Sequence, residues 1–211
     1  ELGEQGIEAL LDLCLGTKVA CSALDFALCP PWLQDVRVEG LTAKLDDGDE
    51  KVRREYVKVL QHYHALATLE PHVQEYVALG SLFLACDGEF MTHDYNGGGR
   101  GQKWELSERG WMSRISEGVR GWEFVEVNES GRVIGLNLKN SLGDPYIGGL
   151  RKMPKALKGL TELETLDLRD NNEVLEKCVE GGLQRLRDAG LVDLHYTTKE
   201  RCQQFLQTAC S

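Results

Sequence analysis

The residue types best suited to chemistry gather in a glycine-rich stretch. Residues 96–103, Asn-Gly-Gly-Gly-Arg-Gly-Gln-Lys, combine glycines, whose backbone amides can surround an anion, with two positive side chains. A phosphate loop, however, ends in Gly-Lys-Ser/Thr after an apolar strand, and here Trp104 stands where the helix should begin. We therefore interpret the stretch as a surface loop, and contact with a partner stays open as its function.

The histidines form neither a metal site nor a catalytic pair. His62 and His64 would point about 200° apart on one helix, and His64 would reach His72 only across a bend. His93 and His195 lack a nucleophile partner, and the chain has no Gly-x-Ser-x-Gly elbow. We therefore expect no catalytic residue, no metal ligand and no cofactor.

The seven cysteines include no Cys-x-x-Cys pair, which argues against a zinc site. Cys14 shares an apolar helical face with nearby leucines and Cys86 ends an apolar helix, so we interpret the cysteines as small buried thiols. The alternative, in an oxidising compartment, is a disulfide between Cys178 and either Cys202 or Cys210, or within the N-terminal trio.

The chain of 211 residues is acidic, with 34 acidic and 24 basic side chains and a formal net charge of −10. Such a surface repels phosphate backbones, so nucleic acid is not an expected partner. No apolar run reaches the roughly 20 residues that cross a bilayer, although peripheral membrane association stays open. The chain begins at Glu1, which leaves open a removed targeting segment and a location in an organelle or the extracellular space.

The clearest structural pattern runs from Met153 to Asn171: Met-Pro-Lys-Ala-Leu-Lys-Gly-Leu-Thr-Glu-Leu-Glu-Thr-Leu-Asp-Leu-Arg-Asp-Asn. Its leucines stand three apart and then alternate at Leu166 and Leu168, which predicts a short strand there and the end of any helix before it. This is leucine-rich-repeat spacing, in which the leucines enter a stacked core and the asparagine satisfies backbone groups at the turn.

A single repeat cannot bury its own apolar face, so neighbouring units are expected. Upstream, residues 131–140 repeat the apolar spacing, with Ser141 in the slot of the asparagine. Downstream, residues 191–196 continue the register after a helix expected over 182–190, although Lys199 replaces the asparagine. In the upstream alignment Val133, Leu136 and Leu138 match Leu163, Leu166 and Leu168.

Residues 121–138 carry a tryptophan, a short strand and a Gly-Arg-Val turn before the first repeat, and they resemble the start of plant-type and algal leucine-rich-repeat domains. The resemblance covers about residues 73–197 and includes a helix at 76–88 that begins an N-terminal cap. It implies a binding fold rather than an enzyme. The cap tryptophans are Trp104, Trp111 and Trp122. The departures from the family are the insertion at 96–103, extra residues at 142–149 and a short array.

The expected fold class is α/β (α+β), a helical N-terminal region followed by a short capped leucine-rich-repeat solenoid with a small parallel sheet. The parts are the helical region at 1–72, the N-terminal cap with its glycine-rich loop at 73–132, the repeats at 133–197 and a C-terminal capping helix at 198–211.

Local signals predict the helix boundaries. Asp49 caps a helix, and Pro71 suits the first turn of the next. Residues 32–48 are expected to be a loop or extended piece, and residues 89–120 to be loop-like. The buried face of the helix that Asp49 caps is expected to consist of Val52, Tyr56, Val59, Leu60 and Tyr63.

The last helix is predicted over Lys199 to Thr208. Thr197 and Glu200 would form its capping box. Such a helix would seal the exposed end of the repeat stack. Its inward residues would be Cys202, Phe205 and Leu206.

Alternation along the strands turns one face of the sheet away from the core. This face is polar and mixed in charge, which favours hydrogen-bonded, electrostatically steered docking. Trp32, beside two prolines, is a further candidate interface residue. The face consists of Gly135, Asn137, Lys139, Thr165, Asp167, Arg169, Asp193, His195 and Thr197.

These features favour a non-catalytic protein–protein interaction or assembly module, with protein partners that include a large multi-subunit complex. Two rival hypotheses stay open. An accessory subunit would bind its complex through the N-terminal helices and use the repeat as structural support. An enzyme would use the loop at 97–103 with nearby histidines to hold a nucleotide or a metal.

Overall fold

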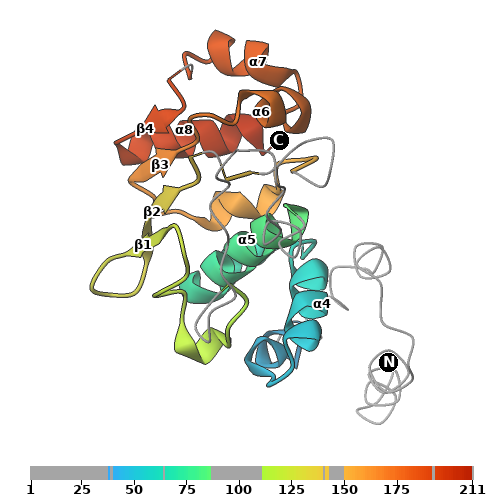
Figure 1. Cartoon of the computed structure of the whole chain (residues 1–211). Coiled ribbons are helices and arrows are strands. Elements are labelled where there is room, and N and C mark those ends of the chain that lie inside the picture. The colour runs from blue at the N-terminus through green and yellow to red at the C-terminus, as the bar shows by residue number, and fades with distance from the viewer. Residues whose placement is uncertain are drawn as a thin grey trace, which may run out of the picture.

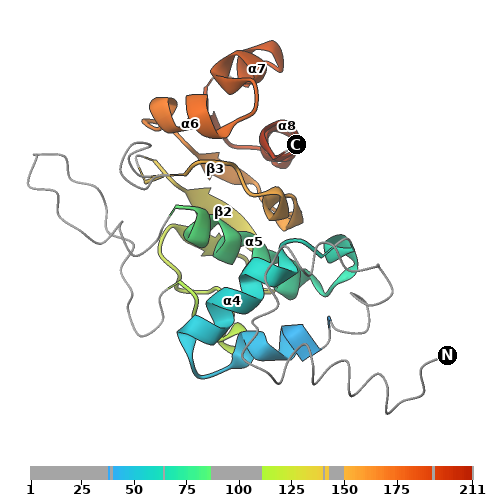
Figure 2. The ribbon, with the colours of Figure 1, turned by 90° about the vertical axis from the view of Figure 1, so that its right-hand side faces the viewer.

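The protein is a mixed α/β structure in which helices precede a small four-stranded sheet (Figure 1). The computed structural model describes residues 38, 40–63, 65–86, 111–139, 141–142, 150–191 and 193–210. Helix α4 (Glu50–Leu60) lies toward one end of the molecule, and α5 (Pro71–Ala85) lies nearer its middle. Helices α6 (Asn172–Cys178), α7 (Gly182–Asp188) and α8 (Lys199–Ala209) lie at the other end, with the sheet between the two ends (Figures 1 and 2).

Helix α4 begins where its sequence signal predicts. The Asp49 side chain accepts a hydrogen bond from the Lys51 backbone amide at 2.8 Å, which satisfies one of the amides left free at a helix start. Val59, Leu60 and Tyr63 are buried as predicted, whereas the other two stripe positions are half-buried. Those two positions are Val52 and Tyr56.

The segment before α4 corrects one expectation. Residues 40–43 are helical and the 3-10 helix η1 (Lys44–Asp46) follows, so a loop over 32–48 is wrong for this part. Leu41 and Leu45 are buried in the core, and this burial stabilises the helical conformation. The sequence did not predict it, because the charged Asp46-Asp47-Gly48-Asp49 run that follows indicates a turn.

Helix α5 is the central helix of the core. Pro71 takes its first position, as predicted, where a missing amide hydrogen is not needed. Every residue from 73 to 83 is buried, because neighbours cover the helix on all sides. The 3-10 helix η5 (Lys155–Gly159) packs against it. A Cβ atom on Gly159 would lie 3.3 Å from the Gln74 carbonyl oxygen, so the two helices approach closely at this glycine.

The sheet has the order β1-β2-β3-β4, and the strands follow one another down the left-hand side of Figure 1 from β4 to β1. Strands β2 (Val133–Asn137) and β3 (Thr165–Asp167) are parallel, as two stacked units require. Strand β1 (Val125–Val127) forms an antiparallel hairpin with β2. Gly131 has a φ of 78° in the hairpin turn, a conformation that favours glycine.

Strand β4 (His195–Tyr196) corrects the prediction of a third parallel unit. It pairs with β3 in the antiparallel direction, so the sheet contains one parallel pair among the described strands rather than a continuing solenoid. Alternation of apolar residues is the same for a strand of either direction, and Leu191, Leu194 and Tyr196 are buried as the pattern requires. Between β3 and β4, α7 matches the helix predicted at 182–190, and α6 was not anticipated.

Helix α8 closes the far side of the core. Its N-cap is Thr198, whose hydroxyl accepts from the Arg201 amide at 3.4 Å, so the predicted cap at Thr197 is wrong by one residue. The helix contacts η5 and β3, and therefore covers this end of the core. The three residues predicted to face inward, Cys202, Phe205 and Leu206, are all buried.

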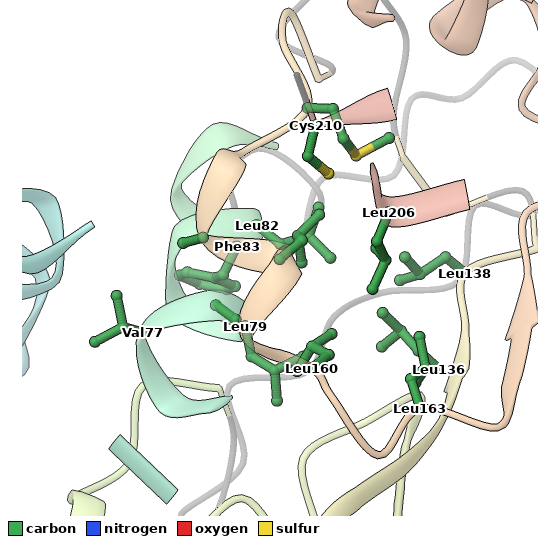
Figure 3. Close-up of a cluster of buried hydrophobic side chains, with 14 of the residues drawn as sticks. Val77, Leu79, Leu82, Phe83, Leu136, Leu138, Leu160, Leu163, Leu206 and Cys210 are labelled. Atoms are coloured by element: carbon green, nitrogen blue, oxygen red, sulfur yellow. The ribbon is translucent and has the colours of Figure 1, made fainter. Parts of the chain in front are cut away.

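The described helices and strands share one hydrophobic core (Figure 3). The cluster includes Leu79 and Leu82 of α5, Leu136 of β2 and Leu206 of α8. All four described cysteines are free and buried, which confirms their interpretation as core thiols; Cys14, Cys21 and Cys29 lie outside the described residues. Burial raises the pKa of Cys202 to about 11 and that of Cys178 to about 12, so neither is a reactive thiolate at neutral pH.

Two of the cap tryptophans pack beside the first unit. Trp111 stacks on Phe83 with ring centroids 5.9 Å apart, and Trp122 lies 5.2 Å from Trp111. Their indole hydrogens donate to the Glu123 carbonyl oxygen at 3.0 Å and the Ser113 hydroxyl at 2.8 Å. Both side chains are structural, as predicted; Trp104 lies outside the described residues.

The Gly-Arg-Val turn is fixed to α5 by a buried carboxylate. Glu75 is 1% exposed and accepts from Arg132 Nε at 2.7 Å and from the Val133 amide at 3.2 Å. Burial raises the pKa of Glu75, and the hydrogen bond from Arg132 opposes that rise. The contact joins the helix to the start of β2.

Candidate functional site

The polar face of the sheet carries a continuous row of side chains from three strands. The strand register pairs Asn137 of β2 with Asp167 of β3, and Asp167 with His195 of β4. The row is present although β4 is antiparallel rather than parallel as predicted, because an antiparallel strand also presents alternate residues to the same face. Five residues predicted for this face are exposed at or near it: Asn137, Lys139, Thr165, Arg169 and His195.

A pocket of about 230 Å³ opens in this face. Gly135 forms part of its lining and sits opposite Thr165 in the register. A Cβ atom on Gly135 would lie 2.8 Å from both the Thr165 hydroxyl and Glu126 Oε2, closer than real Cβ contacts allow. The pocket therefore depends on the absence of a side chain at this position. Its lining comprises Phe124, Glu126, Gly135, Leu136, Asn137, Thr165, Asp167 and His195.

Two pocket residues, Phe124 and Glu126, were missed by the sequence analysis. Glu126 lies in β1 and Phe124 immediately before it, and β1 was expected as a strand without a role in the face. The antiparallel hairpin places Glu126 directly opposite Gly135. Alternation along 124–127, combined with the turn at Gly131, is the signal that would have identified them.

Carboxylates dominate the charge of the pocket. Glu126 and Asp167 line it, and neither Lys139 nor Arg169 does. Arg169 donates to both carboxylate oxygens of Asp167, at 2.9 and 2.6 Å, and this hydrogen bonding lowers the pKa of Asp167. Asp167 is therefore ionised at neutral pH and half-buried beside the pocket.

The remaining predicted residues lie away from the pocket or outside the described chain. Lys139 Nζ pairs with Asp170 at 3.5 Å, beyond the end of β2. Asp193 and Thr197 are exposed on either side of β4. Trp32 lies outside the described residues, and so do the glycine-rich stretch and His93.

Asn171 holds together the backbone that presents this face. Its side-chain amide donates to the carbonyl oxygens of Leu138 at 2.8 Å and Leu168 at 2.9 Å, and its oxygen accepts from the Leu142 amide at 3.0 Å. The asparagine is 4% exposed. Its predicted role in satisfying backbone groups at the turn is confirmed, and it joins the ends of two successive units.

This arrangement is suited to binding. Carboxylates, an amide, a hydroxyl and an imidazole offer hydrogen bonds around a small pocket, and Phe124 adds an aromatic wall. In the part of the chain that the structure describes, no group of three histidine, cysteine or acidic side chains is placed to hold a metal ion. None of the helices described there is long and apolar enough to cross a membrane.

Comparison of the chain with protein-family models, with curated proteins and with solved structures found no match.

Proposed function

We propose that the protein is a non-catalytic protein–protein interaction or assembly module and that its polar sheet face is the recognition surface. The row Asn137–Asp167–His195, with the pocket beside it, carries this proposal. These side chains come from three strands of a hydrogen-bonded sheet, so they are held in place before a partner arrives. Preorganisation of this kind reduces the entropy lost on binding.

The pocket favours a positively charged side chain of the partner. Glu126 and Asp167 supply negative charge at its rim, and Phe124 supplies an aromatic surface on which a guanidinium can stack. Its volume of about 230 Å³ suits one inserted side chain rather than a whole organic ligand, which occupies a pocket of roughly 300 to 1,000 Å³. We therefore infer an arginine or lysine of a partner protein as its occupant.

We further propose that the face is built on two leucine-rich-repeat units behind an N-terminal cap. The parallel β2–β3 pair, the buried leucines at matching positions and the Asn171 bridge support this proposal. An array of two units presents a small patch rather than a broad concave surface. The pocket and the row beside it are in keeping with a small docking site of this kind.

Cross-linking of the protein purified natively from its source tests the recognition surface. Chemical cross-linking and mass spectrometry should join partner peptides to Lys139 and Lys199, which flank the sheet face. Cross-links confined to Lys44, Lys51 and Lys58 would instead assign the interface to the N-terminal helices and contradict the proposal.

A pair of charge-reversal variants tests the pocket itself. Glu126→Lys places a positive charge at the pocket and should weaken partner binding by about tenfold or more, because like charges then face each other. Glu129→Lys makes the same change at an exposed position of the same hairpin that does not line the pocket. Equal binding by both variants would refute the pocket as the contact site.

A further inference from the structure

We propose that a second, basic cavity binds a small organic phosphate. The cavity has a volume of about 660 Å³ and lies between the end of α4, the 3-10 helix η2 (Leu66–Thr68), the start of α5 and η5. This size falls within the range typical of small-molecule sites. The proposal is independent of the sheet-face recognition surface, with which the cavity shares no lining residue.

The charge of the cavity sets it apart from the rest of the protein. Arg132, Lys155, Lys158 and His62 line it, and no lining residue is acidic. The whole chain has 34 acidic side chains and 24 basic ones, so an acid-free wall with three permanent cations opposes the overall balance. A local positive field of this kind concentrates anions.

The two lysines are presented on one side of η5. Side chains three residues apart eclipse one another in a 3-10 helix, which brings Lys155 and Lys158 together. In the described part of the chain, four other lysines form ion pairs, whereas neither of these two does. Two like charges held side by side repel each other, and a bound anion would relieve that repulsion.

Arg132 supplies a fixed set of hydrogen-bond donors at the cavity wall. Its Nε donates to buried Glu75 at 2.7 Å, and its terminal nitrogen donates to the Thr161 hydroxyl at 3.1 Å. Glu75 lies behind the wall and offsets the charge of Arg132, so the surplus charge comes from the lysines. Glu162, which directly follows the cavity residue Thr161, is already paired with Lys199 at 2.8 Å.

The walls are rigid and partly apolar. The Gln74 amide donates to the carbonyl oxygens of Ala67 at 3.1 Å and Leu69 at 2.7 Å, which ties η2 to α5. Tyr63, Leu66 and Pro71 add apolar surface to the same cavity. A lining that contains both cations and apolar groups fits a ligand with a phosphate group and an organic body.

Isothermal titration calorimetry of the full chain with inorganic pyrophosphate and with phenyl phosphate, and with inorganic phosphate as the reference, tests the anion site. We expect one-to-one binding that the double substitution Lys155→Gln/Lys158→Gln weakens by about tenfold or more, because two charge-assisted contacts are lost. The control is Arg151→Gln/Lys152→Gln, which removes the same charge from exposed residues outside the cavity. The control should retain affinity within about twofold.

The possible results separate the proposal from its competitors. Absence of binding by both probes overturns it, and so does equal weakening by the two double variants, which would show only a general effect of net charge. Binding of phenyl phosphate no tighter than that of inorganic phosphate overturns the organic body and retains the anion site. Thermal unfolding supplies an independent measurement, because pyrophosphate should raise the Tm of the native chain and not that of Lys155→Gln/Lys158→Gln.

Discussion

The two junctions that β3 makes, with β2 on one side and β4 on the other, are built differently. At the parallel junction, Asn171 reaches backbone groups of both units, with hydrogen bonds to Leu138 and Leu168 and from Leu142. At the antiparallel junction no buried side-chain amide connects the turns among the residues that the structure describes; the Tyr196 hydroxyl donates instead to the Leu191 carbonyl oxygen at 2.9 Å. The first junction joins two parallel strands, and the second ends the parallel order of the sheet.

The difference indicates what stacking requires beyond an apolar pattern. Both junctions bury apolar residues at the predicted spacing, so burial alone does not choose the strand direction. The polar groups differ, because a parallel stack must satisfy the amides and carbonyls of two turns that leave the sheet at the same edge. Asn171 does this for the β2–β3 pair, and Lys199 stands in the corresponding position after β4.

The largest effect is expected from breaking the parallel junction. Asn171→Ala would leave buried carbonyl and amide groups of Leu138, Leu168 and Leu142 without their partner. Since each unsatisfied buried group costs about 1 to 3 kcal/mol and the turns can relax in part, we expect the free energy of unfolding to fall by about 3 kcal/mol. Urea denaturation followed by circular dichroism measures this change.

The neighbouring asparagine provides the matched control. Asn172 is exposed, so Asn172→Ala should change the free energy of unfolding by less than about 0.5 kcal/mol. Equal losses for the two alanine variants would show that Asn171 does not have the bridging role described above.

A smaller effect is expected at the antiparallel junction. Tyr196→Phe removes one buried hydroxyl and leaves the Leu191 carbonyl oxygen without this donor, while the ring still packs on Phe205. The free energy of unfolding should fall by about 1 kcal/mol, near the net value of one hydrogen bond. A loss as large as that of Asn171→Ala in the same urea experiment would remove the distinction between the junctions.

The sequence predicted the parallel junction well because it depends on local pattern. Leu166, Leu168 and Asn171 occur within six residues, and the two leucines are buried and the asparagine bonds the backbone as their spacing predicts. The direction of β4 was not predictable in this way, because it follows from the path of the chain through α6 and α7. The positive φ values of Gly181 and Gly182 turn the chain between those helices, and glycine spacing alone does not encode the turn direction.

The candidate sites also divide into residues that local pattern predicts and residues that only the path of the chain brings together. Asn137, Asp167 and His195 were placed on one face by alternation, which holds for either strand direction. Glu126 joined them only because the hairpin register sets it opposite Gly135. The basic cavity was not anticipated, since it brings together η5, Arg132 and the end of α4 from distant parts of the chain.

The smallest effect concerns Asp167, the β3 residue that both junctions share. Hydrogen bonds from Arg169 lower the pKa of Asp167, so the folded state favours its ionised form. This stabilisation is present above the unfolded-state pKa of 3.8 and is lost as the pH falls through the lower pKa of the folded protein. Because water screens the exposed Arg169, its size at neutral pH should be about 0.5 kcal/mol.

Comparison with Asp167→Asn isolates this contribution from other carboxylates. The native chain should be slightly more stable than the variant in urea near neutral pH, and the two should converge under acid conditions below the folded-state pKa. A constant difference at all pH values would mean that the charge of Asp167 contributes nothing and that its shape alone matters. A difference that grows on acidification would contradict the lowered pKa. Either result would leave the Asn171 bridge as the main polar distinction between the junctions, because Asp167 stands opposite a residue of each neighbouring strand, Asn137 of β2 and His195 of β4.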